Sequence, residues 1–123
     1  MGSIRPPELE SRLEADNEPF VLDIRPRRSY RSGSIAPSHN VPVYNDLRRG
    51  NDDALCDRMD ELPRDREIIV VCKQGIVAKR ARGLLTEAGY DAVTLAGGMG
   101  GWNGYRNGTL GYRVRTFVWR LFG

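Results

Sequence analysis

The stretch EIIVVCKQGIVAKR, residues Glu67–Arg80, decides the fold of this chain of 123 residues. Its apolar run, Ile68–Val71, predicts a buried strand, because strands covered on both faces are continuous runs of β-branched residues. Cys72 follows that strand directly, a turn with Gly75 comes next, and we expect a helix to begin after the turn. In α/β proteins, ligands bind where the carboxyl ends of parallel strands face helix N-termini, and Cys72 occupies such a position.

The setting of Cys72 favours a nucleophilic sulfur. Unpaired backbone N–H groups and the dipole at a helix N-terminus stabilise a thiolate. Lys73 is adjacent, and the N–H groups of residues 73–77 can form an anion-binding nest where Gly75 permits a tight turn. Such a nest suits a thiolate, a persulfide (Cys–S–S⁻) or a substrate oxyanion. The alternative is a buried cysteine that only packs in the core, as free cysteines often do.

The rest of the chain alternates between strand and helix patterns. We expect further strands at 20–24 and 92–95 and a short strand or extended segment at 40–43. We expect helices at 6–15, 53–62 and 77–88, with a short helical turn at 26–32. Strands and helices that alternate with short connections predict a parallel sheet with helices on both faces. Asp23 and Cys72 then lie at the same edge of the sheet.

Composition indicates one globular domain, with 40% hydrophobic and 28% charged residues. No apolar run approaches the roughly 20 residues of a membrane span. Cys56, Cys72 and the single histidine, His39, make neither a disulfide framework nor a zinc site. We therefore expect no metal, no cofactor and a reducing, cytoplasmic location. Cys56 lies among acidic residues, which disfavour a thiolate, so we expect it to pack on a helix or to be partly exposed rather than to act as a resolving thiol.

Charge is uneven along the chain. Residues 1–67 carry 11 Lys and Arg against 14 Asp and Glu, whereas residues 68–123 carry 8 against 2. The positive half contains Cys72, which suits an anionic substrate or sulfur intermediate. Aromatic residues are not interleaved with the basic ones as in single-strand binders, so no nucleic-acid partner is expected.

Four segments resemble single-domain rhodaneses (thiosulfate sulfurtransferases), in the order and spacing of that family. They are Phe20–Arg25, Gly33–Pro42, Ile69–Gly75 and Leu95–Trp102. The resemblance implies a three-layer α/β fold with a five-stranded parallel sheet. It also implies transfer of a sulfane sulfur through a persulfide on the cysteine at position 72.

The resemblance assigns roles to particular residues. Cys72 matches the nucleophile, Asp23 and Arg25 match residues that support the site, and the active-site loop continues through Lys73, Gln74, Gly75, Ile76 and Val77. From the residues alone, Asp23 could equally be a turn-capping carboxylate, and Arg25 could form a surface ion pair.

The loop departs from the family pattern. Many members have arginine and serine where this chain has Val77 and Ala78, histidine where it has Ser34, and an acidic residue where it has Ser29. Valine cannot bind a sulfonate oxygen, so the donor stays open between thiosulfate and a persulfide or polysulfide. The expected acceptor is a thiol or a cyanide-like molecule, or a sulfur-relay protein, and the expected state is a monomer or homodimer.

Two other functions fit the sequence less well. A phosphatase or arsenate reductase on this fold needs an arginine as the sixth residue after the cysteine, to grip a tetrahedral oxyanion. Here that residue is Ala78, and Arg80 comes two positions late, which argues against phosphoryl transfer. A non-catalytic binding or regulatory module would keep the fold, but the presence of Cys72 argues against it.

The C-terminal residues predict an amphipathic helix at 112–123, beyond a rhodanese domain at 1–111. Its apolar stripe consists of Val114, Phe117, Val118, Leu121 and Phe122. We expect this extension to pack on its own domain or on a partner, because three turns are unlikely to be stable alone. A helix that lies on a membrane surface is the alternative.

Overall fold

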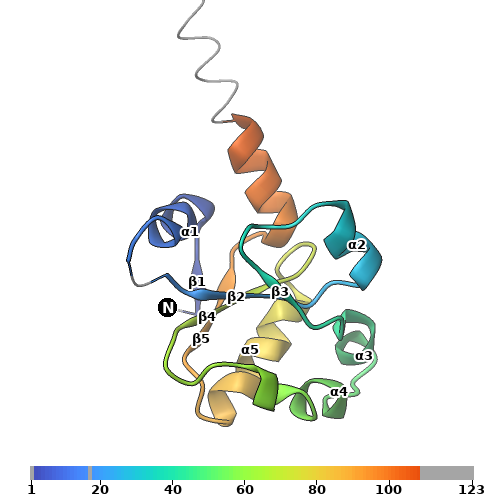
Figure 1. Ribbon diagram of the computed structural model, residues 1–123. Coiled ribbons are helices and arrows are strands. Elements are labelled where there is room, and N and C mark those ends of the chain that lie inside the picture. Colours follow the sequence, from blue (N-terminus) through green and yellow to red (C-terminus); the bar gives the residue numbers. More distant parts are fainter. Residues whose placement is uncertain (1, 17, 109–123) are drawn as a thin grey trace, which may run out of the picture.

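The computed structural model describes residues 2–16 and 18–108, and Figure 1 shows them as a central sheet with helices on both sides. The sheet has five parallel strands in the order β1-β5-β4-β2-β3. The strands are β1 (Ser3–Ile4), β2 (Phe20–Asp23), β3 (His39–Asn40), β4 (Ile68–Val71) and β5 (Ala92–Leu95). The expected three-layer α/β fold with a five-stranded parallel sheet is confirmed.

Helices cover the two faces of this sheet. They are α1 (Pro6–Leu13), α2 (Arg27–Ser32), α3 (Tyr44–Arg48), α4 (Asp53–Cys56), the 3-10 turn η1 (Met59–Glu61) and α5 (Val77–Glu87). Residues 98–108 are also helical and are called helix 98–108 below. In Figure 1, α1 and helix 98–108 lie on one side of the sheet, and α3, α4 and α5 lie on the other.

Strand β4 shows why the chain folds into layers. Successive side chains of a strand point to opposite faces. Ile68 and Val70 accordingly pack in the core on the α5 side, whereas Ile69 and Val71 pack in the core beside α1. All four are buried, and each such side chain contributes about 1.5 to 3 kcal/mol to folding. Cys72 continues the alternation and belongs to the core on the α5 side.

The pairing of β2 with β4 places the two expected site segments next to each other. Asp23 is in register with Val71, and the backbone nitrogen of Ile24 donates to the carbonyl oxygen of Val71 (2.9 Å). The carboxyl ends of both strands therefore lie at one edge of the sheet, as the sequence predicts for Asp23 and Cys72.

The short strand or extended segment expected at 40–43 is a strand only at its first residue. β3 covers only His39–Asn40, because the chain turns directly after it. The backbone nitrogen of Val43 donates to Val41 (2.8 Å) and that of Tyr44 donates to Ile24 (2.9 Å), which leads the chain into α3.

The expected helix at 53–62 is broken into two pieces. α4 ends at Cys56, and η1 follows with i to i+3 bonds. Arg58, between them, has φ −114° and ψ 7°, outside the α-helical range. The carbonyl oxygen of Met59 accepts a hydrogen bond from the hydroxyl of Tyr90 (2.7 Å), so a tertiary contact stabilises the irregular segment.

The amphipathic extension expected at 112–123, and the domain boundary at 111, lie outside the described residues. Within 2–16 and 18–108, every helix is too short or too polar to cross a membrane.

Candidate active site

Cys72 lies directly after β4, with its side chain turned toward the start of α5. Only 1% of the residue is exposed to solvent. Its sulfur accepts hydrogen bonds from the backbone nitrogens of Gly75 (3.1 Å) and Ala78 (3.4 Å). Two main-chain N–H dipoles therefore point at the sulfur, an arrangement that favours negative charge there.

The loop can take this shape because Gly75 adopts a left-handed conformation, with φ +88°. Other residue types rarely occupy this region. A side chain at Gly75 would also crowd the backbone nitrogen of Gly97, 3.1 Å from the place of a Cβ atom. The glycine at the turn is thus required for both its conformation and its close packing.

The first turn of helix 98–108 is hydrogen-bonded to the active-site loop. The backbone nitrogens of Met99 and Gly100 donate to the carbonyl oxygens of Cys72 (2.8 Å) and Lys73 (3.0 Å). These bonds fix the start of the loop, and the N–H groups that donate to the sulfur come later in it, from Gly75 and Ala78. The backbone of the glycine-rich segment therefore packs directly against the loop.

Gly98 makes the closest approach. A Cβ atom there would overlap the carbonyl oxygen of Cys72 and lie 2.8 Å from the backbone nitrogen of Gly75. Gly98 also has a positive φ, +58°. The start of helix 98–108 therefore fits the loop only while this position lacks a side chain.

Asp23 and Arg25 form a buried ion pair. The guanidinium donates to the Asp23 carboxylate from Nη2 (2.8 Å) and Nε (3.1 Å), and the backbone nitrogen of Arg25 donates to it as well (3.0 Å). Arg25 also donates to the carbonyl oxygen of Gly33 (2.7 Å). The Asp23 carboxylate thus caps the turn after β2, through the backbone nitrogen of Arg25, and also pairs with the Arg25 guanidinium. No hydrogen bond joins its carboxylate to residues 72–77, all of which the structure describes.

Asn40 supports this region and was not identified from the sequence. Its side-chain nitrogen donates to the carbonyl oxygens of Asp23 and Arg25, at 2.9 Å each, and so ties β3 to the end of β2. An asparagine two residues before a proline has no distinctive sequence signal. Only the register of β2 with β3 reveals its role.

A cavity of about 170 Å³ opens at the sulfur. It is lined by Tyr44, Cys72, Lys73, Gln74, Ile76 and Val77. Four of the five expected loop residues thus line it, and the fifth, Gly75, supplies the N–H group at the sulfur. Ile76 is 70% exposed, so the rim of the cavity is apolar on one side.

A second cavity of about 300 Å³ adjoins the first. Tyr44 and Lys73 line both, and the other lining residues are Arg25, Pro26, Ser29, Asn45 and Arg48. Tyr44, Asn45 and Arg48 come from α3, a helix that the sequence analysis missed. Arg25 and Arg48 belong to the half of the sequence that is acidic in total, so charge along the chain does not follow charge around the site.

Arg80 is engaged elsewhere. Its Nε and Nη2 atoms donate to the Asp52 carboxylate at 2.6 Å and 2.9 Å, and this pairing raises the pKa of Arg80. It lines neither cavity. The guanidinium that a phosphatase needs over its cysteine is therefore not supplied by Arg80.

Cys56 and His39 lie away from the sulfur cavity. Cys56 is an exposed free thiol on α4. His39 is exposed, and its Nε2 atom lies 3.4 Å from a carboxylate oxygen of Glu61. Neither residue lines the cavity at Cys72.

Comparison with known proteins gives the family. The chain belongs to the rhodanese-like domain family, whose model matches residues 5–105. It is 31% identical over 84 residues to a thiosulfate sulfurtransferase of Shewanella oneidensis, covering 68% of this chain and 74% of the relative. It is 33% identical over 93 residues to a maize adenylyltransferase and sulfurtransferase, covering 74% of this chain but only 19% of that protein.

Solved structures agree with this placement. A human single-domain sulfurtransferase matches with a TM-score of 0.63 and 25% identity, covering 83% of this chain and 95% of that one. The fold and its relatives place the chain in a family of rhodanese-type sulfurtransferases.

Proposed function

We propose that this chain is a sulfurtransferase that carries the transferred sulfur as a persulfide on Cys72. The observation that carries the proposal is the pair of N–H groups, from Gly75 and Ala78, directed at a buried cysteine sulfur that lines an open cavity. Main-chain donors fixed in this way stabilise negative charge with no reorganisation during the reaction.

The reaction has two displacement steps. The Cys72 thiolate attacks the outer sulfur of a donor, the bond between the two donor sulfurs breaks, and the remainder of the donor leaves with the electron pair. The outer sulfur stays on the enzyme as Cys72–S–S⁻. An acceptor thiolate or cyanide then attacks this outer sulfur and releases Cys72 as a thiolate.

The loop favours persulfide or polysulfide donors over thiosulfate. Val77 occupies the position where a cation would meet a sulfonate, and its side chain lines the sulfur cavity. Lys73 is the basic residue of that cavity, and lysine lacks the planar fork with which arginine binds an oxyanion. Asp23 and Arg25 act as positioning residues, because their bonds fix the end of β2 beside the loop.

Intact-mass spectrometry tests the proposal. Purified protein is incubated with thiosulfate, polysulfide or glutathione persulfide, alongside Cys72→Ser and the matched control Cys56→Ser. We expect an adduct of one sulfur atom on the wild type and on Cys56→Ser, removable by cyanide or dithiothreitol and absent from Cys72→Ser. No adduct from any donor would favour a non-catalytic binding module instead.

A further inference from the structure

The geometry points to a second subsite beside Cys72, which binds the carboxylate of a small organic persulfide between Arg48 and Lys73. This inference rests on the proposed function and names the class of donor. Its location is the 300 Å³ cavity that shares Tyr44 and Lys73 with the sulfur cavity.

The positive charge of the residues that line this subsite favours an anionic ligand. Three of its lining residues, Arg25, Arg48 and Lys73, are cationic, and none of the described residues that line it is acidic. Arg25 is neutralised by Asp23. In contrast, the side chains of Arg48 and Lys73 form no hydrogen bond or ion pair with any residue in 2–16 or 18–108. Two uncompensated cations in one concave site attract a carboxylate and can each donate a hydrogen bond to it.

The volume of the subsite suits a ligand larger than an inorganic ion. A water-sized group occupies about 30 Å³, so the second cavity has room for roughly ten non-hydrogen atoms in addition to those in the sulfur cavity. Thiosulfate would fill only the cavity at the sulfur. The side chains of Ser29 and Asn45 add polar groups suited to amide or hydroxyl parts of a larger donor.

The position of the subsite fits the reaction. A donor R–S–S⁻ whose outer sulfur meets Cys72 extends past Tyr44 and Lys73, so its R group enters the second cavity. Cys72–S⁻ forms a bond to the outer sulfur, the donor S–S bond breaks, and R–S⁻ leaves with the electron pair. A carboxylate on R held by Arg48 would orient the S–S bond toward the attacking thiolate.

A binding measurement tests the subsite without sulfur transfer. S-methylglutathione, which has two carboxylates and cannot react, is titrated into Cys72→Ser protein while amide resonances are followed by NMR. We expect saturable shifts at Tyr44, Asn45 and Lys73, and about tenfold weaker binding after Arg48→Gln, because a charge-assisted hydrogen bond is lost. The diethyl ester should bind about tenfold more weakly than the acid.

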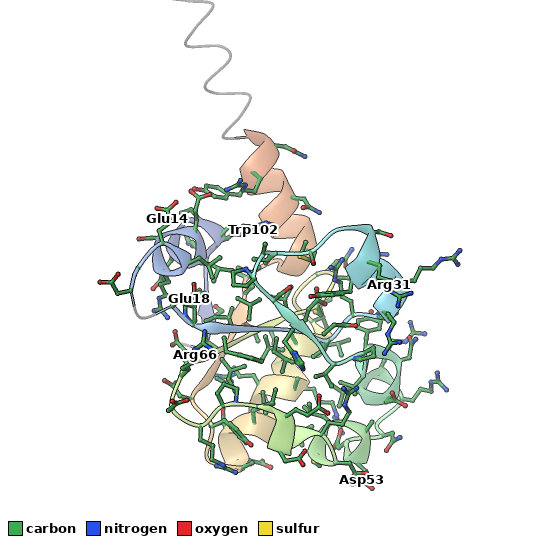
Figure 2. The ribbon with its side chains drawn as sticks, viewed as in Figure 1. Glu14, Glu18, Arg31, Asp53, Arg66 and Trp102 are labelled. Atoms are coloured by element: carbon green, nitrogen blue, oxygen red, sulfur yellow. The ribbon has the colours of Figure 1, made fainter. Side chains whose placement is uncertain are left out.

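Arg31→Gln is the matched control. The substitution removes the same charge from α2. Figure 2 shows Arg31 at the outer surface, and the residue lines neither cavity. Its binding of S-methylglutathione should equal that of the Cys72→Ser parent. Equal affinity for the acid and the ester, or equal effects of Arg31→Gln and Arg48→Gln, would overturn the subsite.

Loading experiments separate this inference from the proposed function. With Cys72 present, glutathione persulfide should load the protein about tenfold more efficiently than its diester, and Arg48→Gln should remove that preference. Loading from every donor without such a preference would overturn the subsite and leave the persulfide function standing. Binding of S-methylglutathione that depends on Arg48, with no persulfide formed from any donor, would overturn the function and keep the subsite.

Discussion

The backbone nitrogen of Met99 donates a hydrogen bond to the carbonyl oxygen of Cys72, at 2.8 Å. Through this bond, helix 98–108 holds the main chain of the cysteine. The cysteine is thus fixed by three main-chain groups, two that donate to its sulfur and one that donates to its carbonyl oxygen.

Gly98→Ala should displace the active-site loop. The new Cβ atom would overlap the carbonyl oxygen of Cys72, so the loop or helix 98–108 must move. We expect the rate at which a persulfide donor loads Cys72 to fall roughly a hundredfold, as follows from a misplacement near 1 Å. Single-turnover intact-mass measurements give the rate, and circular dichroism checks that the variant is folded.

Gly83→Ala is the control for that change. Gly83 lies within α5, and no atom lies within 4 Å of the place of its Cβ, apart from its own helix. The substitution should raise the free energy of unfolding by about 0.5 to 1 kcal/mol, because alanine favours a helix more than glycine does. Its loading rate should match the wild type, and a similar loss in both variants would show that glycine is needed for reasons other than the contact with the loop.

Asp23→Ala should act mainly on stability. It leaves the guanidinium of Arg25 largely buried without its counter-charge, which costs on the order of 3 kcal/mol in the free energy of unfolding. The double variant with Arg25→Met should lose less than the sum of the two single variants. Urea denaturation of the four proteins measures this coupling, and additive losses would contradict it.

Val77→Arg should improve thiosulfate as a donor. The residue is half-buried at the start of α5 and lines the sulfur cavity, so an arginine there can bind a sulfonate with two parallel hydrogen bonds. We expect the KM for thiosulfate to fall about tenfold. Thr86→Arg adds the same charge to an exposed position of the same helix outside both cavities, and an equal fall in that variant would refute a specific contact.

Arg80→Ala should leave the loading rate of Cys72 unchanged. The guanidinium is bound to Asp52 on the surface and is not directed at the sulfur. The substitution should also lower the melting temperature slightly, as the loss of an exposed ion pair does. A large drop in the loading rate would mean that Arg80 reaches the substrate and that its pair with Asp52 opens during the reaction.

The central part of the fold could be predicted because its pattern is strong. The run Ile68–Val71 is apolar without interruption, and α5 places Ala81 and Leu85 on one buried face. Both elements therefore follow from hydrophobic pattern alone. The place of the cysteine between them follows from the same pattern. Of its two N–H donors, Gly75 lies within the expected range 73–77, whereas Ala78 lies one residue beyond it.

Helix 98–108 could not be predicted from local preference. Gly98, Gly100 and Gly101 near its start disfavour a helix. Gly98 is needed because the loop passes close by, and Gly101 because the carbonyl oxygen of Ala96 does. Tertiary packing compensates: Met99 is buried in the core beside α1, and Trp102 packs on that core from the side of the helix that faces α1 (Figure 2).

The elements α3 and β1 could not be predicted from the sequence for a different reason. α3 is five residues long, too short to show a helical period, and only Leu47 on it is buried. β1 has two residues and is defined by its pairing with β5. Tyr44 and Arg48 consequently had no sequence signal that connects them with Cys72, and only the folded chain brings them together.

Main-chain N–H groups donate the hydrogen bonds to the sulfur of Cys72, whereas side chains line the cavities around it. A substitution to any residue other than proline changes a side chain but leaves the backbone N–H group in place. Mutation of Val77 or Arg48 therefore alters which sulfur compound binds without removing the N–H groups of Gly75 and Ala78. The specificity of the site for the sulfur-donating molecule can thus change gradually. Each intermediate variant still stabilises a charged sulfur on Cys72. Directed evolution confined to residues 44–48 and 73–77, with Gly75 kept, is accordingly the shortest route to a redesigned specificity.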